Sequence, residues 1–170
     1  ARMFYYGDVR GDDMQARAQG MRSSSCYEMK YTADDAPDMW TVPYNVIRRA
    51  NRILEAIEQD KILDATAEQL TNIKAEALTV RALVHFDLCR IYANPYTMDN
   101  GASMGVPIVT APLEMDALPS RSSVAEVYTQ VIKDLTDALS SGGLSKDQNY
   151  GYVNTWFAKG LLAKVNLYKG

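Results

Sequence analysis

The sequence predicts an all-α fold, in which antiparallel helix pairs flank a long loop rich in Pro and Gly. Four segments repeat apolar residues at intervals of three and four, which places those side chains on one face of a helix. Two of these segments open with Thr or Ser followed three positions later by Gln or Glu, the capping box of a helix start. Between the second and third segments, residues 95–121 hold four prolines and two glycines, which interrupt helices.

The first predicted pair covers residues 40–93. Pro43 suits the first turn of a helix that runs to about Gln59, because its missing N–H would be unsatisfied there anyway. The apolar stripe of this helix is Tyr44, Ile47, Ala50, Leu54 and Ile57. Thr66 and Gln69 form the box that opens the second helix, which runs to about Ala93 before Pro95. The stripe of that helix is Ile73, Ala77, Val80, Val84, Leu88 and Ile91.

The second predicted pair covers residues 122–170. Ser123 and Glu126 form its capping box, and Asn154 caps a last helix that runs through Tyr168. The third helix carries the stripe Val124, Val127, Val131, Leu135 and Ala138, and it ends at Ser140-Ser141-Gly142-Gly143. The intervening residues, 94–121, are expected to form an irregular loop with a short extended piece around 106–109.

The second helices of the two pairs align at a separation of 76 residues. The matched positions are Ala82 with Ala158, Phe86 with Leu162, Cys89 with Val165, and Tyr92 with Tyr168. Such a repeat is typical of a tetratricopeptide-like arrangement of helix pairs. We therefore expect a single helical-repeat domain or fragment over residues 1–170, with residues 1–39 as an irregular or short-helical lead-in.

The length, net charge and distribution of apolar residues limit the classes of function that this chain can have. The chain has 170 residues, 47% of them hydrophobic, enough for an ordinary core. Its net charge of −3 offers no basic field for a phosphate backbone, so nucleic acid is not expected as a partner. No run approaches the roughly 18 apolar residues of a membrane helix, and the first residues lack the apolar core of a signal peptide. These features, and an end directly after a helical pattern, suggest a trimmed chain from which a partner segment is missing.

The sequence contains no assembled catalytic, cofactor or metal site. His85 is the only histidine, and its apolar neighbours predict a half-buried packing role. The letters of Gly101 to Gly105 match a Gly-x-Ser-x-Gly elbow, but Pro107 follows where that motif needs a helix. Glu76 and Arg81 stand five residues apart, so we expect them to contact neighbouring helices rather than each other.

Four segments in order resemble the SusD/RagB family. Residues 40–51 share its Trp, Tyr, Ile and Ala-Asn pattern, and residues 76–88 share its Glu-Ala-x-x-x-Arg-Ala helix, which leads to Gly-Val-Pro-Ile-Val at 105–109. Residues 121–139 and 158–170 continue the similarity. Two departures stand out, since His85 replaces a usual aromatic residue and the family's long C-terminal half is absent.

This resemblance implies binding without catalysis. Family members are lipid-anchored proteins on the outer face of Bacteroidetes outer membranes, where they capture oligosaccharides or other nutrients beside a SusC-like TonB-dependent transporter. The helical repeats of such proteins serve mainly as scaffold and partner interface. The resemblance thus implies a surface glycan-binding component of a nutrient uptake system, whose lipid anchor lies outside this chain.

Aromatic and polar residues just before the first repeat helix are the candidates for glycan contact. Aromatic rings stack on the C–H faces of pyranoses, and amides bridge pairs of hydroxyl groups. The candidates are Trp40, Asn45, Tyr31, Tyr27 and Arg22. As an alternative, Trp40 and Tyr44 serve as hydrophobic staples at the helix entry.

Two other classes of function remain open at this stage. The helix pairs alone fit a tetratricopeptide-type scaffold for protein–protein interaction, which would bind a peptide in a groove and have no affinity for sugars. A hydrolase would have to use His85, for which the sequence offers no partner constellation.

Overall fold

The computed structural model of the chain describes residues 8–15, 24–30, 32, 39–148 and 151–170. These residues belong to two compact units, Ala1–Val42 and Pro43–Gly170, which are described separately. The prediction of a single domain over the whole chain stays a prediction.

The described part of the first unit contains two short helices. They are the 3₁₀ helix η1 (Asp8–Arg10) and the α-helix α2 (Ser24–Tyr27), which lie in contact with each other. Val9 and Cys26 are their buried residues.

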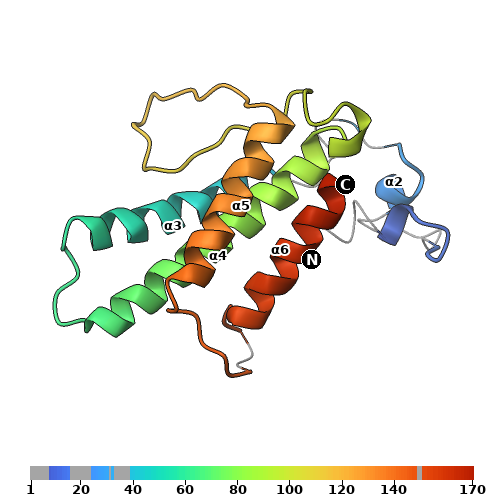
Figure 1. Cartoon of the computed structure of the whole chain (residues 1–170). Coiled ribbons are helices and arrows are strands. Elements are labelled where there is room, and N and C mark those ends of the chain that lie inside the picture. Colours follow the sequence, from blue (N-terminus) through green and yellow to red (C-terminus); the bar gives the residue numbers. More distant parts are fainter. Residues whose placement is uncertain (1–7, 16–23, 31, 33–38, 149–150) are drawn as a thin grey trace. The chain divides into compact units, whose positions relative to one another are not determined.

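The second unit is built from four long helices, so the predicted all-α class is confirmed. They are α3 (Thr41–Glu58), α4 (Ala67–Tyr92), α5 (Val124–Ser140) and α6 (Thr155–Lys169), with the 3₁₀ helix η2 (Tyr96–Met98) after α4. The first two residues of α3 precede the unit boundary. In Figure 1, α5 crosses in front of α4, with α3 on one side of this pair and α6 on the other. Helix α4 packs mainly against α5, and α5 in turn packs against α6.

Both capping boxes form as the sequence predicts. The Thr66 hydroxyl accepts from the N–H of Gln69 at 3.2 Å, and the Thr66 N–H donates to Gln69 Oε1 at 2.9 Å. Ser123 and Glu126 make the same reciprocal pair at 3.2 and 2.7 Å. Asn154 accepts from the Phe157 N–H at 2.9 Å. These local bonds satisfy backbone donors that a helix start leaves unpaired, and so they fix where three of the helices begin.

The core of the second unit lies between the helices. All five residues of the stripe predicted for α5 are completely buried. For α4 the single predicted stripe is wrong, because Ile73, Val80 and Val84 are only half-buried. Its fully covered positions include Ala75, Ala82, His85 and Phe86, which do not lie on one stripe. A helix that packs on several sides has no single apolar face.

The loop between α4 and α5 divides into a buried and an exposed half. Residues 105–107 and 109 are buried, whereas nearly every residue from 110 to 121 is exposed. The extended piece predicted at 106–109 joins no sheet, and the described residues contain only an isolated β-bridge between Met104 and Ser123. Arg121 holds the base of the loop, donating to the carbonyls of Gly105 at 2.6 Å, Tyr92 at 3.0 Å and Met104 at 3.2 Å.

None of the helices in the described parts of the chain has the length and apolar character that crossing a membrane requires.

Candidate functional site

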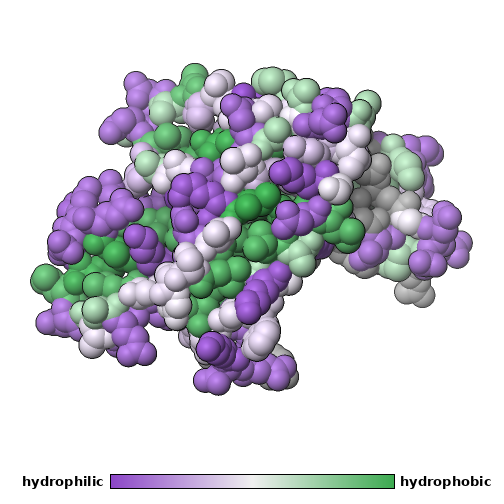
Figure 2. Space-filling model, viewed as in Figure 1, coloured by the Kyte–Doolittle hydropathy of each residue, from purple (hydrophilic) through white to green (hydrophobic). Residues whose placement is uncertain are grey.

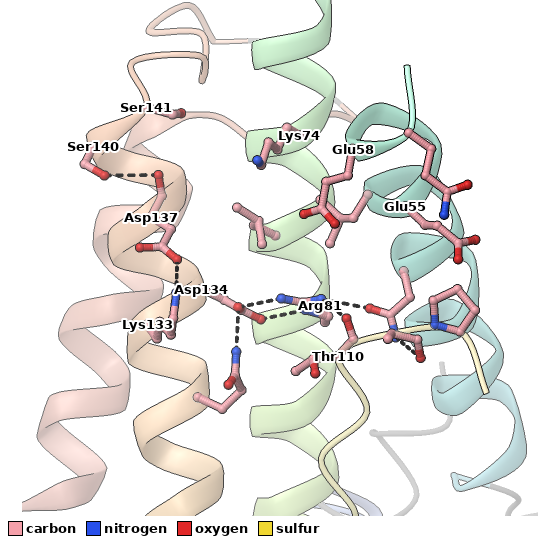
Figure 3. Close-up of a pocket in the computed structure, with 17 residues that line it drawn as sticks. Glu55, Glu58, Lys74, Arg81, Thr110, Lys133, Asp134, Asp137, Ser140 and Ser141 are labelled. Atoms are coloured by element: carbon pink, nitrogen blue, oxygen red, sulfur yellow. Dashed lines mark hydrogen bonds and ion pairs between the residues drawn. The ribbon is translucent and has the colours of Figure 1, made fainter. Parts of the chain in front are cut away.

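A buried guanidinium joins three helices and the loop at the middle of the second unit. Arg81 of α4 donates to both carboxylate oxygens of Asp134 on α5, at 2.8 and 2.7 Å. On its other side, Nη1 of Arg81 donates to Asn51 Oδ1 of α3 at 2.8 Å and to the Thr110 carbonyl at 2.9 Å. Figure 3 shows Arg81 reaching towards α5 on one side and towards α3 and the loop on the other. The prediction that Arg81 contacts neighbouring helices is confirmed.

Asn51 extends this network to the loop backbone. Its Nδ2 donates to the carbonyl of Val109 at 3.0 Å and to that of Ala111 at 3.2 Å, while its Oδ1 is occupied by Arg81. Tyr44, about two helical turns earlier on α3, donates its hydroxyl to the Pro107 carbonyl at 2.9 Å. Helix α3 therefore binds the loop at three carbonyls, two of them in its buried half, and Tyr44 has a structural role.

His85 completes the attachment of the loop. The backbone N–H of Val109 donates to His85 Nε2 at 3.2 Å, so Nε2 is the unprotonated nitrogen of the ring. Nδ1 then carries the proton and donates to the carbonyl of Arg81 at 3.0 Å. The ring is completely buried, not half-buried as predicted, and this burial lowers the pKa of His85 to about 4. His85 is thus a neutral structural residue with both ring nitrogens occupied.

A groove of about 790 Å³ lies over the Arg81 network, between α3 and α5. Its α3 wall presents Glu55, Glu58 and Gln59, and its α5 wall presents Lys133, Asp137, Ser140 and Ser141. Figure 3 shows these side chains flanking Arg81, with Lys74 of α4 above it. The lining contains both signs of charge, amides and hydroxyl groups, but no aromatic ring. The groove could accept a polar group by hydrogen bonds, but it has no surface on which a sugar ring would stack.

The polar groups at the floor of this groove already have hydrogen-bond partners within the chain. The oxygens of Asp134 accept from Arg81 and, at 2.8 Å, from Gln130 Nε2, and Lys133 pairs with Asp137 at 2.5 Å on the rim. A buried ion pair in which every nitrogen and oxygen already has a partner stabilises the fold and is not a vacant ligand site. We therefore assign the Arg81 network to the scaffold.

The structure places three of the five residues predicted to contact a glycan. Tyr27 closes α2 and Trp40 directly precedes α3, and their side chains are 36% and 38% exposed. Both belong to the first unit, whereas Asn45 lies in the first turns of α3 in the second unit and is partly buried. Arg22 and Tyr31 lie outside the described residues. The grouping of these five residues around one ligand stays a prediction.

Sequence reasoning missed the partners of Arg81. Asn51 and Asp134 interrupt otherwise apolar faces, since Asn51 adjoins Ala50 and Asp134 adjoins Leu135 in the buried stripes. A polar residue at a core position must find a partner, and this signal could have marked both residues. Which partner each finds depends on packing between helices. Among the described residues, no group of three or more His, Cys, Asp or Glu side chains is placed to hold a metal ion.

Comparison with known proteins gives consistent results. The SusD-like family, described as starch-binding and associating with the outer membrane, matches residues 3–167. The crystal structure of a SusD superfamily protein from Bacteroides vulgatus superposes with a TM-score of 0.90 and 36% identity over 99% of this chain. One from Bacteroides thetaiotaomicron superposes with a TM-score of 0.88 and 40% identity, again over 99% of the chain.

A SusD-like protein of Bacteroides ovatus is 28% identical over 128 residues, which are 75% of this chain. The chain spans only a part of each relative, namely 38% of each of the two crystal structures and 21% of the Bacteroides ovatus protein. Because the family match extends over almost every residue, from the lead-in to the last turn of α6, the chain belongs to the SusD-like family.

Proposed function

We propose that this chain is the N-terminal helical part of a non-catalytic protein that binds glycans at the cell surface. The observation that carries the proposal is the family match over residues 3–167, since the family is described as starch-binding and associating with the outer membrane. In this proposal the full-length protein is an outer-membrane lipoprotein of a Bacteroidetes species. It delivers oligosaccharides to a SusC-like TonB-dependent transporter.

The helices and the ligand residues have separate tasks in this proposal. Helices α3 to α6, tied together by the Arg81 network, act as scaffold and contribute no catalytic group. Trp40, Asn45, Tyr31, Tyr27 and Arg22 contribute to the glycan site. The partial exposure of Trp40 and Tyr27 supports this role, because an aromatic residue must be accessible from outside to stack on a pyranose.

The binding proposal is tested by isothermal titration of the full-length protein with maltooligosaccharides and with digests of other polysaccharides. We expect at least one of these glycans to bind, and Trp40→Ala to weaken its binding by tenfold or more. Tyr152→Ala, which removes another exposed aromatic residue of the chain, is the matched control and should leave the affinity unchanged. If no glycan binds, whereas a peptide ligand does, the protein is an interaction scaffold and the proposal fails.

The remaining parts of the proposal need their own measurements. Prolonged incubation of the full-length protein with a bound glycan should release no new reducing ends, because binding occurs without catalysis. Solubilised outer membranes should yield the protein together with a TonB-dependent transporter, and metabolic labelling should place a lipid on it. Isolation of the protein without transporter and without lipid would remove the uptake role but leave glycan binding to stand.

A further inference from the structure

The outward side of α3 carries three arginines next to one of the predicted glycan contacts. Arg48, Arg49 and Arg52 follow Asn45 at intervals of three, four and seven residues, which places all four side chains on the same side of the helix. Each of the three arginines is exposed, and together they are called the arginine face. In Figure 2 hydrophilic side chains gather over α3 at the left of the view. The buried residues of α3 lie on its opposite side, and they are Ile47, Ala50, Asn51 and Leu54.

The arginine face is locally unfavourable for the helix that carries it. Arg52 stands four residues from Arg48 and three from Arg49, so like charges are neighbours on the helix surface. No carboxylate in the described parts of the chain forms an ion pair with any of the three. A solvated helix face commonly pairs charges of opposite sign, as Lys133 and Asp137 do on α5. Three cations that repel one another without a counterion are typical of a surface that meets an anion.

We propose that the arginine face makes the glycan site selective for saccharides that carry carboxylate or sulfate groups. This inference rests on the proposed glycan function and adds the charge of the ligand to it. A guanidinium presents paired N–H donors that match two oxygens of a carboxylate or of another oxyanion, a geometry that a lysine ammonium lacks. The amide of Asn45 bridges hydroxyl groups of the same ligand, because it supplies both donors and an acceptor.

The size and charge of the arginine face favour a saccharide over a protein or a membrane surface. From Asn45 to Arg52 the face spans about 10 Å of helix, at roughly 1.5 Å per residue. A stable protein partner covers about 800 Å² on each side, far more than four side chains of one helix present. Binding to an anionic membrane takes a cluster of roughly four to eight basic residues, and the net charge of −3 of the chain opposes it. A short anionic oligosaccharide needs neither the larger area nor the stronger field.

The first experiment compares ligands that differ only in charge. The full-length protein is titrated calorimetrically with oligogalacturonides and with their methyl esters, and with sulfated galactan oligosaccharides and their desulfated forms. We expect at least one anionic form to bind at least tenfold more tightly than its uncharged counterpart. This preference should shrink at high salt, because dissolved ions screen exposed charges.

The second experiment removes the charge from the arginine face. The triple variant Arg48→Gln/Arg49→Gln/Arg52→Gln keeps long side chains of similar helix propensity at exposed positions. We expect the full-length variant to bind the anionic form at least tenfold more weakly, and to bind the uncharged form within twofold of the unaltered protein. Its melting temperature should stay the same or rise, because the substitutions remove repulsion between like charges.

A second triple variant is the matched control for net charge. Lys61→Gln/Lys74→Gln/Lys146→Gln removes the same positive charge from exposed positions outside the arginine face. We expect both affinities to stay unchanged in this variant. An equal loss of anion binding in both triple variants would mean that only net charge matters, and it would overturn the proposal.

The remaining outcomes separate this proposal from the proposed function. If maltooligosaccharides bind and no anionic form binds more tightly than its uncharged counterpart, the selectivity fails and glycan binding stands. An arginine-face variant with unaltered affinity for the anionic form leads to the same conclusion. If no saccharide of either kind binds, both proposals fail. If the protein instead sediments with phosphatidylglycerol vesicles and the arginine-face variant does not, the partner of this face is a membrane surface.

Discussion

Arg81 on α4 and Asp134 on α5 form a two-pronged ion pair in the interior of the helical unit. Nε and Nη2 of the guanidinium donate to Oδ2 and Oδ1 of the carboxylate at 2.8 and 2.7 Å, and the two side chains are 7% and 2% exposed. Paired donors in this geometry give orientation as well as attraction. The pair thus fixes how α4 and α5 lie against each other.

Removing one partner of this pair should be costly. Asp134→Ala leaves the charge of Arg81 buried without a counterion, and we expect the free energy of unfolding to fall by about 3–5 kcal/mol. Urea denaturation followed by circular dichroism measures the change. The matched control is Asp137→Ala, which breaks the exposed Lys133–Asp137 pair on the same helix and should cost less than about 1 kcal/mol. Equal costs for the two variants would mean that the buried pair contributes no more than a surface pair.

The buried histidine makes stability depend on pH. Burial lowers the pKa of His85 from 6.5 to about 4, so the unfolded chain takes up a proton between these values that the folded chain does not. The stabilisation is therefore complete above pH 6.5 and is lost as the pH falls towards 4. At pH 4 or below the loss reaches roughly 3 kcal/mol, at 1.36 kcal/mol for each unit of pKa.

His85→Gln removes the pH-dependent part of the unfolding free energy that comes from this histidine. Glutamine offers a hydrogen-bond acceptor near the position of Nε2 and does not titrate. The difference between the two proteins in unfolding free energy should shrink or reverse from pH 7 to pH 4. As His85 is the only histidine, its titration can also be followed directly by NMR. A measured pKa near 6.5 would be incompatible with the buried, hydrogen-bonded ring.

Two glycines should respond to alanine in opposite directions. A Cβ on Gly143 would lie 2.4 Å from the carbonyl oxygen of Thr71 on α4, too close for any real contact. Gly143→Ala should therefore lower the unfolding free energy by about 1–3 kcal/mol through overpacking. Gly160→Ala has open space and should raise it by roughly 0.5–1 kcal/mol. Thermal melts of the two variants in the 170-residue chain test this, and a shift of the same sign in both would refute it.

The thiol of Cys89 should be inert in the folded protein. It is 2% exposed, and burial raises its pKa to about 11, so almost none of it is thiolate at pH 8. In a Cys26→Ser background, we expect iodoacetamide to alkylate Cys89 at least a hundredfold more slowly in buffer than in 6 M guanidinium chloride. Mass spectrometry gives both rates, and similar rates would show that α4 opens readily at this point.

The helices could be predicted from the sequence because their signals are local. Ser123 and Glu126 stand three residues apart, and that spacing alone places the start of α5. The apolar stripe of α5 is regular because one side of this helix faces the core. The same reasoning failed for α4, since its packing on several sides depends on where α3, α5 and the loop come to lie.

The network around Arg81 could not be predicted in the same way. Its partners Asn51 and Asp134 are 30 and 53 residues away along the chain, so no spacing rule connects them. The burial of His85 was underestimated for a related reason, since the N–H that satisfies its ring comes from Val109 in the loop. The five predicted glycan contacts rest on residue type and on family resemblance, and their grouping around one ligand stays a prediction.

The way the loop is attached to α3 and α4 determines what a cut in its exposed part would do. Residues 105–111 are bound by Asn51, Arg81 and His85, whereas Met115 and Leu118 stand almost completely in solvent. The peptide bonds near Met115 therefore connect the segment before the loop to the segment after it without taking part in the packing of either. A protease that cuts there leaves two fragments, one carrying α3 and α4 and the other α5 and α6. Because the Arg81–Asp134 pair and the common core join the two fragments, we expect them to elute together from a sizing column after the cut.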